Sequence, residues 1–128
     1  MKAKDLAAVW SSPDNSRLTP KQSSFRLPIH VAAKLSALSE MFPQKTRTQM
    51  VADLLSAALA DLEAGLPALP GKFSFKDEEG VSQYEAVGPA AIFRTLTNKH
   101  YIELEKELGN ENPAPFFIGT LVVAKDEE

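Results

Sequence analysis

The chain has 128 residues, a formal net charge of −3 and a hydrophobic fraction of 44%, which suffices for one ordinary core or two very small ones. It has no cysteine, which excludes disulfides, thiolate metal sites and cysteine nucleophiles. No apolar run approaches the ~20 residues of a membrane helix, and the first fifteen residues lack the apolar stretch of a secretory signal. These features predict a cytoplasmic protein without a membrane-spanning segment.

Positive charge is concentrated in one part of the sequence. Between residues 16 and 49, six lysines and arginines stand against Glu40 alone, which gives a local charge of +5 and leaves −8 for the rest of the chain. This asymmetry fits a basic face on an acidic body, as a nucleic-acid-binding protein would have, or a chance cluster of solvated side chains.

Residues 1–20 are expected to form an N-terminal arm. A short amphipathic helix is predicted over residues 3–10, with Trp10 as its packing anchor, and turn-forming residues follow. The alternation in "KQSSFRLP", residues 21–28, predicts a short strand with Phe25 and Leu27 on one face and Ser24 and Arg26 on the other.

Two helices are predicted next. The first covers residues 29–42 and ends at Pro43, because apolar residues recur at helical spacing at Val31, Leu35, Leu38 and Phe42. Thr46 and Gln49 have the spacing of a capping box, which predicts a second helix that runs to about Leu62. Its apolar surface is wider than one neighbour needs, so it belongs at the centre of a monomeric core or in a dimer core; this surface comprises Met50, Val51, Leu54, Leu55, Ala58, Leu59 and Leu62.

In the rest of the sequence we predict a linker at residues 65–71 and a small α+β segment at residues 72–128. "KFSFK" and "VSQYEAV" alternate on either side of the turn "DEEG" and predict a hairpin. A helix is expected from Pro89, with an apolar stripe formed by Phe93, Leu96, Tyr101, Leu104 and Leu108. "FFIGTLVVA", residues 116–124, predicts a final strand that is covered by other parts of the fold.

Signals of catalysis are weak. His30 and His100 have no ligand-spaced partner, and the carboxylates at 77–79 and 103–107 are typical of a turn and of a solvated helix face. Glu85, at the end of the predicted hairpin, is the only acid that stands apart. There is no glycine-rich phosphate loop and no nucleophile elbow. We therefore expect no catalytic residue, no metal and no cofactor.

The order of a short strand, "RLP", an amphipathic helix, a break and a capped helix resembles the ribbon-helix-helix family of bacterial DNA-binding proteins over residues 21–63. One strand and two short helices cannot bury a sufficient core alone. The resemblance therefore implies a homodimer with antiparallel paired strands and interlocked helices. Its core in this chain would contain Phe25, Leu27, Leu35, Leu38, Val51, Leu54, Leu55 and Leu59.

The same resemblance implies how double-stranded DNA would be bound. The outer side of the paired ribbon enters the major groove, and here it would present Gln22, Ser24 and Arg26 to the bases. The start of the second helix faces the phosphates, because its amides and dipole favour an anion. The phosphate contacts would come from Lys21, Lys45, Thr46, Arg47 and Thr48. The function implied is that of a transcriptional regulator.

The sequence leaves an alternative open, in which the fold serves as a dimerisation or protein-interaction module without DNA affinity. The acidic total, Ser23 at an inward ribbon position and "PQK" in place of a glycine-containing turn favour it. Residues 72–128 would pack on the core, extend the dimer, or receive a protein partner or ligand. Over nearly the whole length, stretches such as "LAAVW", "FRLPIHVAAKLSALSEMFP" and "YEAVGP" also resemble a group of short bacterial proteins, some of them labelled type 1 pilus tip component.

Overall fold

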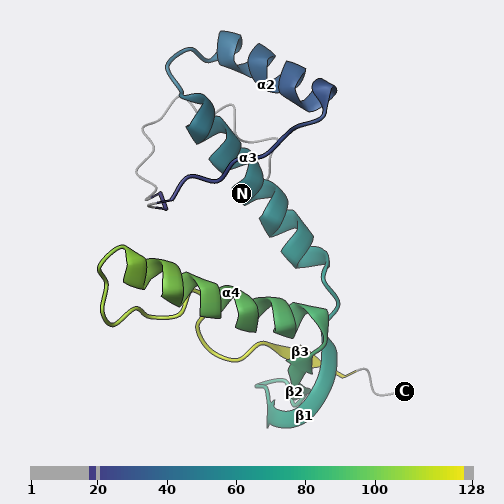
Figure 1. Cartoon of the computed structure of the whole chain (residues 1–128). Coiled ribbons are helices and arrows are strands. Elements are labelled where there is room, and N and C mark those ends of the chain that lie inside the picture. Colours follow the sequence, from purple (N-terminus) through teal and green to yellow (C-terminus); the bar gives the residue numbers. More distant parts are fainter. Residues whose placement is uncertain (1–17, 20, 126–128) are drawn as a thin grey trace. The chain divides into compact units, whose positions relative to one another are not determined.

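The computed structural model describes residues 18–19 and 21–125. The chain divides into two compact units, Met1–Ala64 and Gly65–Glu128, which are treated separately below. The described residues form three helices, α2 (Ile29–Met41), α3 (Arg47–Gly65) and α4 (Pro89–Glu107), and three strands, β1 (Leu69–Lys76), β2 (Ser82–Val87) and β3 (Val122–Ala124) (Figure 1). The predicted α+β class is confirmed. The helix predicted over residues 3–10 lies outside the described residues.

The first unit is built on the helix pair α2 and α3. Pro28, with φ −54° and ψ 147°, precedes α2, and its carbonyl accepts hydrogen bonds from the amides of Val31 and Ala32 at 3.1 and 3.0 Å. The helix ends where the amide of Phe42 donates to the carbonyl of Leu38 at 2.9 Å, just before Pro43. The bounds of α2 and α3 lie within a few residues of the predicted ones, which were residues 29–42 and a helix from Thr46 to about Leu62.

The core of the first unit is small. Met50 is fully buried and Ala57 nearly so, and they pack with the half-buried side chains of Leu38, Phe42 and Leu54. Leu35 is the buried residue of α2. Among the described residues, several large apolar side chains of this unit remain exposed; these are Leu18, Phe25, Leu27, Ile29, Met41, Leu55, Leu59 and Leu62.

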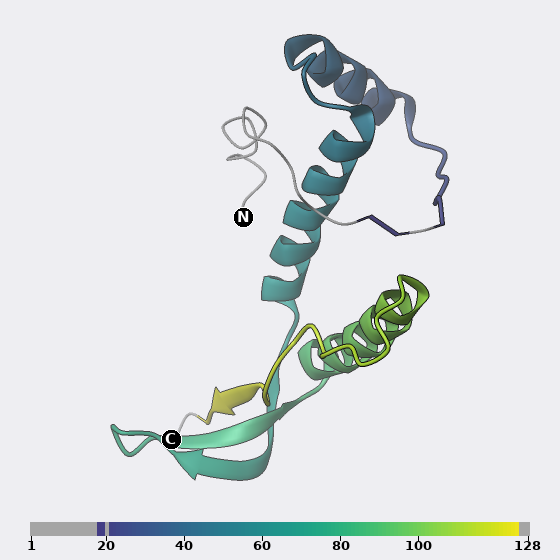
Figure 2. The ribbon, with the colours of Figure 1, turned by 90° about the vertical axis from the view of Figure 1, so that its left-hand side faces the viewer.

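The strand predicted over residues 21–28 is absent from the single chain. These residues form a coil that leads into α2 (Figure 2), and the sheet of the described chain consists of β1, β2 and β3 alone. A β-strand requires a partner for its backbone amides and carbonyls. The ribbon implied by the family resemblance would find that partner in a second copy, so one chain lacks the pairing that defines a strand.

The second unit begins with the predicted hairpin. β1 and β2 pair antiparallel from Leu69 opposite Val87 to Lys76 opposite Ser82, with two breaks in register on either side of Phe73. Asp77 stabilises the turn, because its side-chain Oδ1 accepts hydrogen bonds from the amides of Glu79 and Val81, each at 2.9 Å. The sheet order is β1-β2-β3, which leaves β1 at an edge.

The predicted linker over residues 65–71 is too long. Gly65 is still helical, and β1 already starts at Leu69. Pro70 is accommodated because an edge strand does not need every amide for pairing. Gly71 is required by close packing, since a Cβ at this position would lie 2.7 Å from Cγ1 of Val87 and 2.9 Å from the carbonyl oxygen of Glu85.

The predicted final strand is shorter than expected, with only Val122–Ala124 in β3, and it is not covered throughout, since Phe116 and Ile118 are exposed. Residues 110–121 instead run back along α4 (Figures 1 and 2). Asn98 of α4 holds this segment: its Nδ2 donates to the carbonyl of Phe117 at 3.1 Å and its Oδ1 accepts from the amide of Phe117 at 2.8 Å. A side-chain amide therefore takes the place of a neighbouring strand at residue 117.

The α4 helix begins at Pro89, as predicted, but its faces differ in part from the prediction. Of the predicted apolar stripe, Phe93 and Tyr101 are half-buried, and their rings lie next to those of Phe117 and Phe116. The other three members, Leu96, Leu104 and Leu108, are exposed. Glu105, which was expected on a solvated face, is only 6% exposed. The side-chain amide of Asn110 donates a hydrogen bond to the carboxylate of Glu105 at 3.4 Å, and the backbone amide of Asn110 donates to the carbonyl of Glu105 at 3.0 Å. Both contacts form because the chain folds back after Gly109.

Candidate nucleic-acid interface

An open, mainly apolar groove lies in the first unit between the coil before α2 and the first half of α3. Its volume is about 640 Å³. The coil contributes Leu18, Thr19, Lys21, Gln22, Ser23 and Phe25, and α3 contributes Arg47, Thr48, Val51, Ala52 and Leu55. Of the predicted phosphate contacts, Lys21, Arg47 and Thr48 therefore lie along one groove with part of the segment predicted as a ribbon, and Lys45 and Thr46 are not among its lining residues.

The predicted base-contacting residues lie in the coil and are all exposed. Ser23 and Phe25 line the groove, whereas Ser24 and Arg26 do not; Leu27, predicted on the same face as Phe25, does not line it either. Gln22 lines the groove as well and so departs from its predicted place beside Ser24 and Arg26. Arg26 is the longest of the three predicted base-reading side chains and is exposed to solvent.

The start of α3 has the predicted capping box. Oγ1 of Thr46 accepts a hydrogen bond from the amide of Gln49 at 3.1 Å, and Oε1 of Gln49 accepts one from the amide of Thr46 at 3.0 Å. This arrangement satisfies one of the first amides of the helix. The amides of Arg47 and Thr48 lie in the first turn, where the helix itself offers no acceptor. Both residues are exposed, so an anion could approach them.

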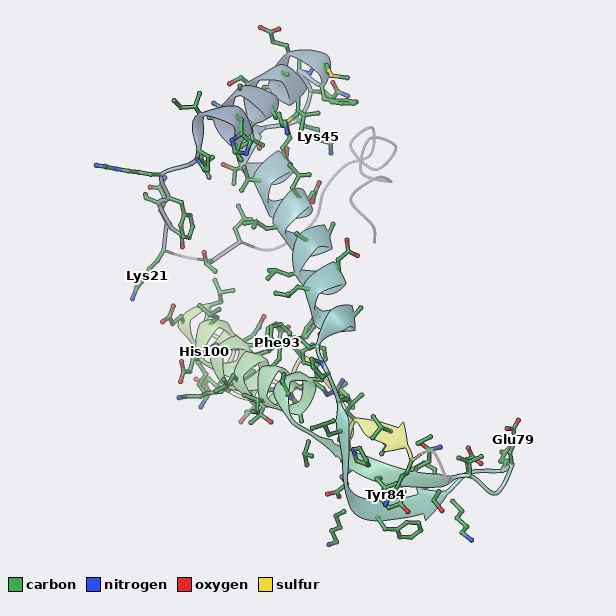
Figure 3. All side chains as sticks on the ribbon, turned by 90° about the vertical axis from the view of Figure 1, so that its right-hand side faces the viewer. Lys21, Lys45, Glu79, Tyr84, Phe93 and His100 are labelled. Carbon is green, nitrogen blue, oxygen red and sulfur yellow. The ribbon has the colours of Figure 1, made fainter. Side chains whose placement is uncertain are left out.

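The basic side chains near the start of α3 differ in how they are held. Nη2 of Arg47 donates to Oγ of Ser36 at 2.7 Å, which holds its guanidinium against α2. Lys45, half-buried, lies in the turn before α3, and Lys21 extends from the coil into solvent (Figure 3). Ser36 was not predicted as part of the site, because its contact with Arg47 crosses the turn between two helices and leaves no periodic signal.

The predicted dimer-core residues divide into two groups. Leu35 is buried, and Leu38, Val51 and Leu54 are half-buried within the helix pair. Phe25, Leu27, Leu55 and Leu59 are exposed, with Phe25 78% and Leu55 52% accessible. The second group is the part of the predicted core that a single chain leaves uncovered.

The two histidines and Glu85, which were considered for catalysis or metal binding, lie on three different elements. His30 is exposed at the start of α2, and Nδ1 of His100 lies 3.5 Å from Oε2 of Glu103 on the exposed surface of α4. Glu85 is exposed on β2. Across residues 18–19 and 21–125, no three histidine, aspartate or glutamate side chains are grouped to hold a metal ion. Within the same part of the chain, every helix is too short or too polar to cross a membrane.

Comparisons with known proteins give no relative. No protein-family model matches the chain, and neither a curated protein nor a solved structure matches it. The function is therefore argued from the residues and geometry of the first unit.

Proposed function

We propose that this protein is a homodimeric double-stranded DNA-binding protein, a transcriptional regulator that reads the major groove with a two-stranded ribbon formed by residues 21–28 of two copies. The observation that carries this proposal is the row of exposed apolar side chains along the groove and α3. Phe25, Leu55 and Leu59 are each at least half exposed in the single chain.

Burial by a second copy explains this exposure. Each large apolar side chain gains roughly 1.5–3 kcal/mol on full burial, and the first unit alone buries few of them. If two copies pair their coils antiparallel, Phe25 and Leu27 cover the helices, and the backbone groups of residues 21–28 obtain the partners that one chain lacks. The wide apolar surface of α3 then lies in a shared core.

The same pairing would turn the polar side of the ribbon toward DNA. Ser24 and Arg26 lie off the groove, and arginine binds the O6 and N7 atoms of guanine with two hydrogen bonds. The start of α3 would bind a phosphate through the amides of Arg47 and Thr48, while Lys21 and Lys45 add positive charge. The local charge of +5 in residues 16–49 supports this assignment.

Two measurements test the proposal. Light scattering of the full chain is expected to give twice the mass of one chain, 14.0 kDa. Selection from a random duplex library, followed by gel-shift titration at moderate salt, is expected to enrich a short palindromic site. Replacement of Arg26 by alanine should weaken binding to that site and leave the mass unchanged. A monomer, or the absence of any DNA binding at low salt, would refute the proposal.

A dimerisation or protein-interaction module without DNA affinity is the second candidate, and the contact between Arg47 and Ser36 favours it. This hydrogen bond, at 2.7 Å, gives Arg47 a structural partner in the absence of DNA. The net charge of −3 and the glycine-free turn "PQK" agree with this function. A dimer that binds no DNA at any salt concentration would support the second candidate over the first. A pilus-associated role would belong with this candidate.

A further inference from the structure

A separate pocket lies in the second unit, where β2, α4 and the segment leading into β3 meet. Its volume is about 240 Å³. The apolar part of its lining consists of Ala86, Ala91 and Leu121, and the polar part includes Arg94, Thr95 and Thr120. The amide of Ala86 donates to the carbonyl of Leu121 at 2.8 Å, which joins the two sides of the pocket.

The guanidinium of Arg94 makes two contacts at this pocket. Its Nη2 donates to the carbonyl of Gly119 at 3.3 Å, and its central carbon lies 4.7 Å from the ring centroid of Phe117. Gly119 has φ +79°, a conformation that favours glycine. A guanidinium has five N–H donors, and within the described residues Gly119 is the one hydrogen-bond acceptor that the structure gives Arg94. Further donors are thus available to a ligand.

The charge of the second unit makes this arginine distinctive. Residues 65–128 contain six basic and eleven acidic residues, and Arg94 is the only arginine among them. A lysine or arginine that only solubilises an acidic surface needs neither an aromatic ring nor a carbonyl acceptor beside it. Arg94 has both, and it lines the pocket together with the exposed residues Thr95 and Thr120 and with Ala86, Ala91 and Leu121.

We propose that this pocket binds a small carboxylic acid with a short apolar chain. The carboxylate accepts paired hydrogen bonds from the Arg94 guanidinium, whose planar fork matches carboxylate geometry. The hydroxyls of Thr95 and Thr120 donate to the same group, and the apolar chain of the ligand lies on Ala86, Ala91 and Leu121. All residues of this site belong to the second unit, whereas the residues proposed to bind DNA belong to the first.

The proposal is tested by titrating the full-length protein with acetate, butanoate, hexanoate and inorganic phosphate at constant ionic strength, followed by amide NMR shifts. Saturable shifts are expected at Thr95, Asn98 and Gly119–Leu121. Because the pocket lining is more polar than apolar, affinity should rise only modestly from acetate to hexanoate, by about fourfold in total, the gain from burying a single methylene. No saturation up to high millimolar hexanoate, or equal binding of phosphate, acetate and hexanoate, would overturn the proposal.

Substitutions make the test specific. Arg94→Ala should lower hexanoate affinity at least tenfold, whereas Lys99→Ala, which removes the same charge from an exposed position on α4 outside the pocket, should leave it unchanged. Because Arg94→Ala also removes the contact with Gly119, the double variant Thr95→Val/Thr120→Val provides a second test with Arg94 intact, and a severalfold loss is expected. Unchanged affinity in the double variant, or an equal loss in Lys99→Ala, would refute the assignment.

Discussion

Thr46 and Gln49 exchange hydrogen bonds across the first turn of α3: each side chain accepts from the backbone amide of the other, at 3.1 and 3.0 Å. Oγ1 of Thr46 also donates to Oε1 of Gln49 at 3.2 Å, so the two side chains fix each other's orientation. This pair fixes the first residue of α3 and, with it, the position of the amides of Arg47 and Thr48 that we propose face DNA.

Replacement of Thr46 by alanine should lower the free energy of unfolding by about 1 kcal/mol, because the amide of Gln49 loses its acceptor. Thr46→Ser retains the hydroxyl and should remain close to the original stability. Urea denaturation followed by circular dichroism measures both variants. Equal stability of the alanine and serine variants would contradict a stabilising role of the cap.

Replacement of Leu55 by glutamate should convert the proposed dimer into a monomer. Leu55 lines the groove and is 52% exposed in the single chain. A carboxylate in the dimer core would be buried without a partner, which costs several kcal/mol. The measurement is sedimentation equilibrium across a range of concentrations.

The matched control for this variant is Ile118→Glu, since Ile118 is 81% exposed and belongs to the second unit. It adds the same charge and should leave the mass unchanged. If Ile118→Glu dissociated the dimer and Leu55→Glu did not, the interface would have to lie in the second unit.

Arg26 and Lys45 should have different effects on DNA binding. Arg26→Ala should cost about 1–3 kcal/mol of discrimination at one base pair of the selected site. Lys45→Ala should weaken binding to all sequences and reduce the slope of log affinity against log salt by about 1. Gel-shift titrations on the selected site and on a scrambled duplex, at several salt concentrations, separate these effects. Equal losses on both duplexes in Arg26→Ala would exclude base reading by Arg26.

Asn98→Ala should destabilise the second unit, because the amide and carbonyl of Phe117 both lose their partner. A half-buried pair of this kind is expected to contribute about 1–3 kcal/mol. Hydrogen exchange at the amide of Phe117 should become faster. Asn112→Ala is the control, since only the backbone amide of Asn112 takes part in its contact with Asn110, at 3.2 Å. Unaltered exchange at Phe117 in Asn98→Ala would show that other contacts hold the segment.

Replacement by alanine should lower the free energy of unfolding at Gly71, and should leave it unchanged or raise it at Gly65. At Gly71 the new Cβ would lie within 3 Å of Val87 and of the backbone of Glu85, so the hairpin must shift, at a cost of about 1–3 kcal/mol. At Gly65 there is open space at the end of α3, and alanine should be neutral or stabilise the protein by up to about 1 kcal/mol. Thermal denaturation compares the two variants, and a stabilised Gly71→Ala would be inconsistent with the close approach.

The elements predicted correctly are those with short-range signals. The bounds of α2 and α3 follow from apolar spacing, from Pro43 and from the Thr46–Gln49 pair, all of which act within four residues along the chain. The hairpin follows from alternation on either side of a turn that Asp77 stabilises through its neighbours. Such features are determined by the local backbone, so the sequence pattern contains most of the information needed to predict them.

The features that were missed depend on distant partners. Residues 116–121 have the composition of a strand, but Asn98, which is nineteen residues from Phe117, takes up the backbone groups of Phe117. The burial of Glu105 is an exception, since Asn110, which donates to its carboxylate, is only five residues away, but that contact forms past the end of α4 and has no periodic signal. Arg94 contacts Gly119 across twenty-five residues, and no periodicity reveals that contact. The strand predicted over residues 21–28 is coil in the single chain, and the backbone partner that it would need is part of our proposal of a second copy.

The register breaks in β1 affect how the protein behaves at high concentration. A regular, uncovered edge strand can add further strands from other molecules and lead to fibrous aggregates. In β1, irregular pairing on both sides of Phe73 disturbs the even spacing of the outer backbone groups. Lys72 and Lys76 add charge along the same exposed edge. We therefore expect the hairpin, although Phe73 and Phe75 are half-exposed at an open sheet edge, to resist stacking with its own copies.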